Sequence, residues 1–176
     1  MTLAAYIADP ANRFATVAMT DTNGLLRGQM VSTRSLKGIA SAGMGMAPAQ
    51  LALDPTDVML SMPGVNDNTG DFHDDPLVLD PTSVRQLPWS KPGHDLLVLS
   101  NYTGASAAMC PRGLLRRVID RAGAAGLVPK YGMELEYTLF DETPESARET
   151  GYRNLKTATT PASHALISYQ VLHTEW

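Results

Sequence analysis

The stretch FATVAMTDTNGLLRGQMV, residues 14–31, decides the fold of the first half of the chain. Phe14 to Met19 is a run of β-forming residues, and Leu25 to Val31 is a second one. Between them lies the pair Asn23–Gly24, a strong signal for the tight turn of a hairpin because both residue types tolerate positive φ. The stretch therefore predicts two antiparallel strands joined by a short turn.

Further short strands are expected after this hairpin. The candidate segments are Asp57–Leu60, Pro76–Leu79 and Asp95–Ser100, each a short apolar run between turn-forming residues. The connections GIASAGMGMAPAQ (38–50) and MPGVNDNTGDFHDDP (62–76) are rich in glycine or proline, which is typical of exposed loops. Residues 1–104 thus predict a small β-rich domain.

The character of the sequence changes after Gly104. The segment PRGLLRRVIDRAGAAGL (111–127) predicts an amphipathic helix, because Pro111 stands at its start and Gly126 at its end. One apolar stripe at helical spacing comprises Leu114, Leu115, Val118, Ala122 and Ala125. Residues 105–176 therefore predict the opening of a second domain that mixes helix and strand.

A strand is expected at YGMELEYTLF, residues 131–140. Side chains alternate along a strand, so Glu134 and Glu136 would share one face roughly 7 Å apart, with Thr138 beside them. The opposite face is apolar throughout. A half-exposed strand with solvated glutamates gives the same alternation, so periodicity alone leaves open whether the two carboxylates have a function.

The last segment, PASHALISYQVLHTEW (161–176), predicts another helix whose apolar side includes Trp176. One helix, one strand and part of a second helix make too small a core for an independent domain. We therefore expect a truncated chain, either an expressed fragment or an interrupted gene product. The alternative is a genuinely short protein that ends in a frayed helix.

Composition excludes several classes of protein. The net charge is −4 and the lysines and arginines do not cluster, which argues against nucleic acid or an anionic membrane as a partner. The N-terminus lacks the pattern of a signal peptide, and no apolar run reaches the ~20 residues of a membrane span. The lone Cys110 excludes an internal disulfide and a cysteine-based zinc site. A cytoplasmic protein is expected.

Three other features of the sequence do not indicate a binding site. GMGMAP (43–48) lacks the third glycine of a dinucleotide-binding loop, and there is no Walker lysine motif. NDNTGDFHDD (66–75) does not fit EF-hand spacing and is interpreted as a solvated acidic loop. The four histidines show no ligand spacing.

Four segments, taken in order, resemble landmarks of the glutamine synthetase family. They are DTNGLLRGQMV (21–31), DDPLVLDPTSVRQLPW (74–89), CPRGLLRRVIDRAGAAGL (110–127) and YGMELEYTLFDETPES (131–146). They correspond to an Asp-Gly-Arg-Gly hairpin, an Asp-Pro-Thr-x-Arg-x-x-Pro-Trp stretch, a Pro-Arg helix and a Gly-x-Glu-x-Glu-aromatic strand. The resemblance covers essentially the whole chain and is carried by the order of all four.

The resemblance implies an α+β architecture. Residues 1–104 would be an N-terminal β-grasp domain, and residues 105–176 the incomplete beginning of a glutamine synthetase catalytic domain. In this family the β-grasp domain packs against the catalytic domain of a neighbouring subunit in a homo-oligomeric ring. The active sites lie at that junction.

The resemblance also implies an ATP-dependent carboxylate–amine ligase, which forms a γ-glutamyl amide through a γ-glutamyl phosphate. Mg²⁺ or Mn²⁺ would neutralise the phosphates, with Glu134 on the metal that bridges ATP and Glu136 on the metal beside the glutamate-like acid. Gly132 is a candidate for lying near ATP. Arg27 and Arg112 belong to family landmarks, and both structural and functional roles are open for them.

The amine substrate is expected to differ from ammonia. Ammonia-using members carry an Asp-Gly-Ser-Ser stretch whose aspartate binds ammonium, and the corresponding region GMGMAPAQLALDPTDVML (43–60) lacks it. We therefore expect an alkylamine, polyamine or similar amine as the substrate. Asp54 is the candidate substitute acid; the alternative is that it forms the turn before Pro55.

Two classes of function remain in view. The first is a metal- and ATP-dependent ligase of which this chain is the N-terminal part. The second is a non-catalytic module that only assembles with full-length subunits. The further metal-binding glutamates, the histidine near the phosphates and the substrate-binding arginines of the family would lie beyond Trp176, so the chain alone is expected to be inactive.

Overall fold

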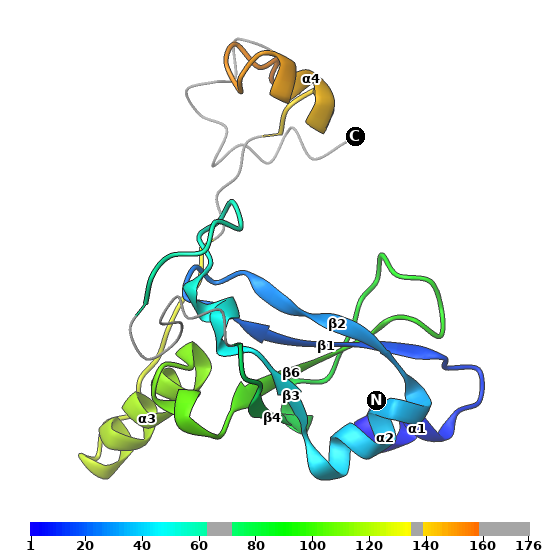
Figure 1. The fold of residues 1–176 in the computed structure, drawn as a ribbon, viewed down its shortest axis with the longest axis vertical. Coiled ribbons are helices and arrows are strands. Elements are labelled where there is room, and N and C mark those ends of the chain that lie inside the picture. The colour runs from blue at the N-terminus through cyan, green and yellow to red at the C-terminus, as the bar shows by residue number, and fades with distance from the viewer. Residues whose placement is uncertain (63–71, 135–138, 159–176) are drawn as a thin grey trace. The chain divides into compact units, whose positions relative to one another are not determined.

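The computed structural model describes residues 1–62, 72–134 and 139–158. The chain forms two compact units, Met1–Pro129 and Lys130–Trp176, which are described separately (Figure 1). The first unit contains the helices α1 (Leu3–Ala8), α2 (Thr33–Ala42) and α3 (Pro111–Ala124), the strands β1 (Phe14–Thr20), β2 (Leu26–Ser32), β3 (Met44–Met46), β4 (Asp75–Leu79), β5 (Arg85–Gln86) and β6 (Leu96–Tyr102), and the short 3₁₀ helices η1 (Pro48–Ala52), η2 (Pro81–Ser83) and η3 (Ala105–Ala108).

The strands of the first unit form one mixed sheet in the order β2-β1-β6-β4-β3, with β5 also paired to β6. The central pair, β1 and β6, is parallel, and every other pairing in the described residues is antiparallel. β4 and β5 lie along the same side of β6 at different positions, and η2 spans the interval between them. The α+β class is confirmed.

The hairpin predicted at residues 14–31 is confirmed. β1 and β2 pair from Phe14↔Ser32 to Thr20↔Leu26, and Gly24 adopts a positive φ of 81° in the turn. At Gly28 the two strands approach closely, because a Cβ there would sit 2.0 Å from the carbonyl oxygen of Val17. A side chain at this position would therefore force the pair apart.

The core lies on one face of the sheet. β6 alternates between buried and half-buried residues, which is the period of a strand with one covered face. The helices α1 and α2 cover one part of this face through Tyr6 and Leu36, which pack with Val17 and Val98. A second cluster joins β1, η1, β4, β6 and the residue directly before α3, and it consists of Met19, Leu51, Leu77, Tyr102 and Cys110.

Other strand predictions have mixed outcomes. The strands expected at 76–79 and 95–100 are confirmed as β4 and β6. The strand expected at 57–60 is wrong, because Asp57 has a left-handed φ of 66° and the segment makes a single bridge, Leu53↔Met59. This conformation turns the chain instead of extending it.

The loop expected at 38–50 is also wrong, since it contains the end of α2, all of β3 and most of η1. The buried Leu36 anchors α2, and the Ser32 hydroxyl caps it by accepting a hydrogen bond from the N–H of Ser35 at 3.1 Å. Of the second expected loop, residues 63–71 lie outside the described part, and 72–74 have no regular structure.

The helix predicted after Pro111 is confirmed as α3, and Gly126 follows it with a φ of 75°. Its apolar stripe is exposed, however: Leu114, Leu115 and Val118 retain 52%, 53% and 49% of their accessible surface. Only the first residues of α3 pack against the sheet.

The second unit contains α4 (Pro144–Glu149), capped at Thr143. Tyr131–Glu134 are not in a strand, so the strand expected over residues 131–140 does not begin where it was predicted. Phe140 forms one bridge with Thr157, while residues 135–138 and the helix expected at 161–176 lie outside the described part. The domain boundary expected at residue 104 stays a prediction.

No helix within residues 1–62, 72–134 and 139–158 has the length and apolar character to cross a membrane.

Candidate functional site

The first landmark, the β1–β2 hairpin, is built around a buried ion pair. The Nε of Arg27 donates to Oδ2 of Asp21 at 2.9 Å, and the two side chains are 14% and 0% exposed. Oδ1 of Asp21 accepts from the N–H groups of Asn23 and Leu25 at 2.8 and 2.9 Å. Asp21 therefore shapes the turn and holds the arginine at the same time.

Burial alone would raise the pKa of Asp21. The hydrogen bond from Arg27 and those from the backbone of Leu25 and Asn23 outweigh burial, so the pKa of this carboxyl lies below its ordinary value. Asp21 is thus held ionised beside Arg27.

The same hairpin holds the segment Leu51–Asp57. The hydroxyl of Thr22 donates to the carbonyl of Leu51 at 3.1 Å, and the side-chain amide of Asn23 donates to the carbonyl of Leu53 at 2.8 Å. Arg27 adds an ion pair with Asp57 and a hydrogen bond to the carbonyl of Asp54 at 3.3 Å. For Arg27 these contacts favour the structural role over a catalytic or substrate-binding role.

Asp54, the candidate substitute acid, forms a turn. Its Oδ1 accepts from the N–H and hydroxyl of Thr56, both at 2.8 Å, and from the N–H of Val58 at 2.9 Å. The bond from Val58 and then those from Thr56 lower the pKa of this carboxyl. This geometry is that of the turn-former considered as the alternative role, and a contact of Asp54 with a substrate stays a prediction. In the same loop the side chain of Asp57 is 69% exposed.

The second and third landmarks meet through Arg112. Its terminal NH2 nitrogen donates to Oδ2 of Asp80 at 2.6 Å, and its Nε donates to Oδ1 of Asn101 at 3.1 Å. Oδ1 of Asp80 accepts from the N–H of Thr82 at 3.0 Å and so caps η2. The Thr82 hydroxyl contributes most to lowering the pKa of Asp80; burial opposes it, and the Thr82 backbone and Arg112 add to the effect.

The predicted metal and nucleotide residues fall at the start of the second unit. Glu134 is exposed, and so is Gly132, where a Cβ would meet no atom within 4 Å. Glu136 lies outside the described residues. Within the described ranges no three His, Cys, Asp or Glu residues gather as a metal site. Glu134 offers oxygen ligands of the type that Mg²⁺ and Mn²⁺ prefer, and its pairing with Glu136 stays a prediction.

Sequence reasoning missed the acidic partners of both arginines. Asp21 opens the turn six residues before Arg27, so an ion pair within one hairpin was a detectable signal. Asp80 and Arg112 are 32 residues apart, and their contact depends on how η2 and α3 meet β6. No local pattern reports such a contact.

The family model "Glutamine synthetase, catalytic domain" matches residues 108–174. The chain is 36% identical over 97 residues to the γ-glutamylethanolamide synthetase GlnA4 of Streptomyces coelicolor, covering 54% of this chain and 20% of that protein. It is 25% identical over 165 residues to type-1 glutamine synthetase 2 of Dictyostelium discoideum, covering 92% and 30%. It is 29% identical over 133 residues to a γ-glutamylanilide synthase of an Acinetobacter species, covering 70% and 27%. The chain thus spans less than a third of the length of these relatives.

Solved structures agree with this assignment. The "GmaS/ADP complex" superposes with a TM-score of 0.54 at 26% identity, covering 71% of this chain and 26% of that one. A "novel glutamine synthase homolog" shares the fold with a TM-score of 0.52 at 22% identity, covering 81% and 36%. The landmark segments, the match to the catalytic-domain model and the γ-glutamyl-amide synthetase relatives together place this chain in the glutamine synthetase family.

Proposed function

We propose that the chain is the N-terminal part of an ATP-dependent ligase that joins the γ-carboxylate of glutamate, or of a similar acid, to an organic amine. The observation that carries the proposal is the 36% identity to a γ-glutamylethanolamide synthetase. A second relative is named for a γ-glutamyl anilide, which is again an amide of an organic amine. The region 43–60 also lacks the Asp-Gly-Ser-Ser stretch expected of an ammonia-using enzyme.

The N-terminal unit supports the β-grasp assignment. Its first two strands form a hairpin, and β1 pairs in parallel with the last strand, β6. The helix α2 packs through Leu36 on the face of the sheet that carries the core. We propose that this unit is the β-grasp domain of the ligase, that the ligase is a cytoplasmic homo-oligomeric ring, and that the catalytic domain begins near residue 105.

Glu134 and Glu136 are proposed to hold Mg²⁺ or Mn²⁺ in the full-length enzyme. The metal would supply positive charge against the phosphates of ATP, and the solved relative named as an ADP complex supports a nucleotide in this family. The chain itself would place two carboxylates where charge must be neutralised. Since phosphoryl transfer depends on many such groups held together, the 176-residue chain alone is proposed to be inactive.

Ordinary glutamine synthesis is the competing function, because the type-1 glutamine synthetase relative matches 92% of this chain. The non-catalytic module is a third outcome. The three functions predict different results when the full-length protein is assayed for amide formation with ammonia and with organic amines.

The deciding experiment measures phosphate release by the full-length protein with glutamate, ATP and Mg²⁺ against a panel of ammonia, ethanolamine, alkylamines, polyamines and aniline. Mass spectrometry identifies the amide that is formed. We expect an organic amine to give the highest kcat/KM. Ammonia exceeding every organic amine would establish glutamine synthesis instead, and no amide with any amine would favour the non-catalytic module.

A further inference from the structure

We infer that Arg112 is a positioning residue that couples the first helix of the catalytic domain to the N-terminal sheet. The inference concerns α3, which begins inside the part of the chain matched by the catalytic-domain model and yet packs on the sheet. Its kinetic consequence rests on the proposed ligase function. Its structural consequence is testable on the chain as it stands.

The contacts of Arg112 fix it in two directions. The guanidinium donates to Asp80, which precedes η2, and to Asn101 on β6, at 2.6 and 3.1 Å. A planar guanidinium with two acceptors on different elements cannot rotate without losing one of them. The side chains of Arg112 and Asp80 are 30% and 16% exposed, so water competes only in part for this pair.

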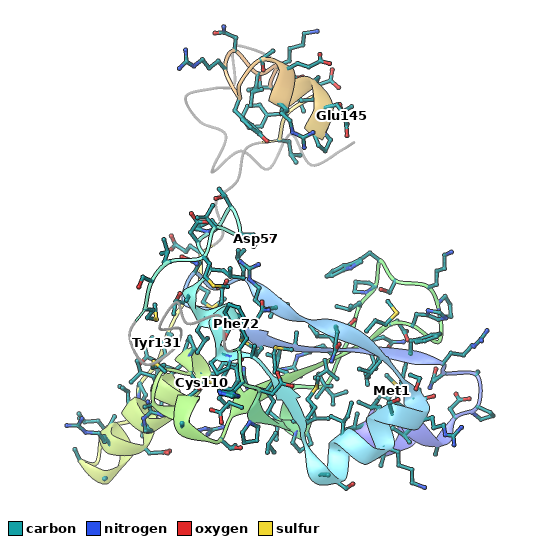
Figure 2. The ribbon with its side chains drawn as sticks, viewed as in Figure 1. Met1, Asp57, Phe72, Cys110, Tyr131 and Glu145 are labelled. Atoms are coloured by element: carbon teal, nitrogen blue, oxygen red, sulfur yellow. The ribbon has the colours of Figure 1, made fainter. Side chains whose placement is uncertain are left out.

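The rest of the base of α3 is held in the same place. The N–H of Ser106 in η3 donates to Oδ2 of Asp75 at 2.6 Å, joining η3 to β4. Arg117 donates to the carbonyls of Ala107 and Ala108 at 3.0 and 2.8 Å, joining α3 to η3. Cys110 is buried directly before the helix, and Figure 2 labels it where α3 meets the sheet.

Beyond this base the helix has little support in the described part of the chain. No residue of α3 is buried, and Figure 1 shows the helix extending away from the sheet. Its direction is therefore set by the contacts of its first two turns. Among these, Arg112 makes the ion pair with an element that is distant along the chain.

The length of α3 amplifies any change at its base. The helix has 14 residues and is therefore about 20 Å long. A tilt of about 10° at the base would move its far end by roughly 3.5 Å, given the rise per residue of an α-helix. Along the chain, the candidate metal residue Glu134 comes ten positions after Ala124, the last residue of α3. Because a displacement of about 1 Å can cost a factor of ~10² in rate, a shift of this helix would slow the proposed ligase reaction.

The structural test is hydrogen exchange measured by mass spectrometry on the 176-residue chain. Arg112→Ala should speed amide exchange in α3 at least ~10-fold and leave β1 and β6 within about twofold of the wild type. Arg116→Ala is the matched control, because Arg116 is exposed on the same helix. Arg112→Lys should give an intermediate rate, since an ammonium lacks the planar fork that reaches both acceptors.

Asp80→Asn is a second variant that tests the same contact in case Arg112→Ala unfolds the whole chain. Asparagine keeps an oxygen for the N–H of Thr82 but removes the charge that faces Arg112. If Arg112→Ala speeds amide exchange throughout the chain, the test becomes the exchange rate of α3 divided by that of β1 and β6, measured in Asp80→Asn. A ratio equal to that of the wild type would overturn the inference.

The kinetic test uses the full-length ligase. Arg112→Ala should raise the Mg²⁺ concentration for half-maximal rate by about tenfold, whereas Arg116→Ala should leave it unchanged. A loss of folded enzyme would lower the maximal rate without changing that concentration, so the readout separates positioning from stability. An unchanged half-saturating concentration in Arg112→Ala refutes the catalytic consequence. If the wild type forms no amide at all, the proposed function fails, and hydrogen exchange still decides the coupling.

Discussion

Replacing Asp21 by asparagine isolates the charge in the hairpin while keeping its shape. The amide oxygen of the new side chain can still accept from the N–H groups of Asn23 and Leu25. Its NH₂ group, however, would face the Nε–H of Arg27, which now donates to a carboxylate oxygen at 2.9 Å. One charge-assisted hydrogen bond is lost and two donors are brought together.

The expected cost follows from burial. Asp21 is fully covered, and breaking a buried ion pair costs about 3–5 kcal/mol when the partner is left unpaired. Arg27 keeps Asp57 and the carbonyl of Asp54, so the cost should fall to about 2 kcal/mol. The free energy of unfolding of a small domain is only about 5–15 kcal/mol, so a loss of this size is readily measured.

The assay is urea unfolding at pH 7, with the midpoint compared at constant m-value. Asp57→Asn is the matched control, because it removes the other carboxylate from the same arginine and asparagine tolerates the left-handed φ of 66°. Exposed ion pairs contribute about 0–1 kcal/mol, so its midpoint should move little. Equal shifts for the two variants would show that burial of the pair does not decide its contribution.

The pH dependence of this effect has a definite sign. The pKa of Asp21 is lower in the folded protein than in the unfolded chain, so the carboxylate stabilises the fold above its unfolded pKa of about 3.9. This contribution is lost as the pH falls through the folded pKa. The stability difference between wild type and Asp21→Asn should therefore be full at pH 7 and shrink below about pH 4. A difference that grows on acidification would contradict the argument.

Three further predictions concern the strand pair, α2 and the proposed metal site. Gly28→Ala should destabilise the fold by about 3 kcal/mol or more, because its Cβ would lie 2.0 Å from the carbonyl oxygen of Val17; a normal thermal midpoint would show this approach to be wrong. Gly38→Ala on the exposed side of α2 should instead stabilise by about 0.5–1 kcal/mol, since no atom lies within 4 Å of the added carbon. In the full-length enzyme, Glu134→Ala and Glu136→Ala should each abolish turnover while circular dichroism stays unchanged, and substantial activity in Glu136→Ala would reject its role.

The sequence was informative wherever local chemistry decides the structure. The Asn-Gly pair correctly predicted the turn of the hairpin. Pro111 at the start of α3 and Gly126 after its end correctly predicted the bounds of that helix. The strand expected at 57–60 is wrong because the turn at Asp54, which the sequence offered as the alternative role of that residue, extends into this segment. Asp54 before Pro55 accepts hydrogen bonds from the next residues and so turns the chain, and this outweighs a short apolar run.

Non-local structure was beyond the reach of pattern reasoning. β1 and β6 pair in parallel across about eighty positions of sequence, as Ala15↔Leu96 shows, and nothing in either strand names the other as its partner. α2 was missed because Gly38 within it and Gly43 directly after it resemble the glycines of a loop, although Ser32 offered a capping signal. The prediction that Glu134 and Glu136 share one face required a strand from residue 131, and residues 131–134 are not in a strand.

Two of the family landmarks carry an arginine that ties together segments distant from each other along the chain. Arg27 of the first landmark ties the hairpin to the segment Leu51–Asp57, within the region expected to face the amine. Arg112 of the third landmark ties α3 to Asp80 of the second. Both guanidinium groups make these contacts in the described structure, which favours a role for each arginine in fixing where another segment lies. The proposed ligase would depend on such placement, because catalysis requires that the reacting groups are held in the right geometry.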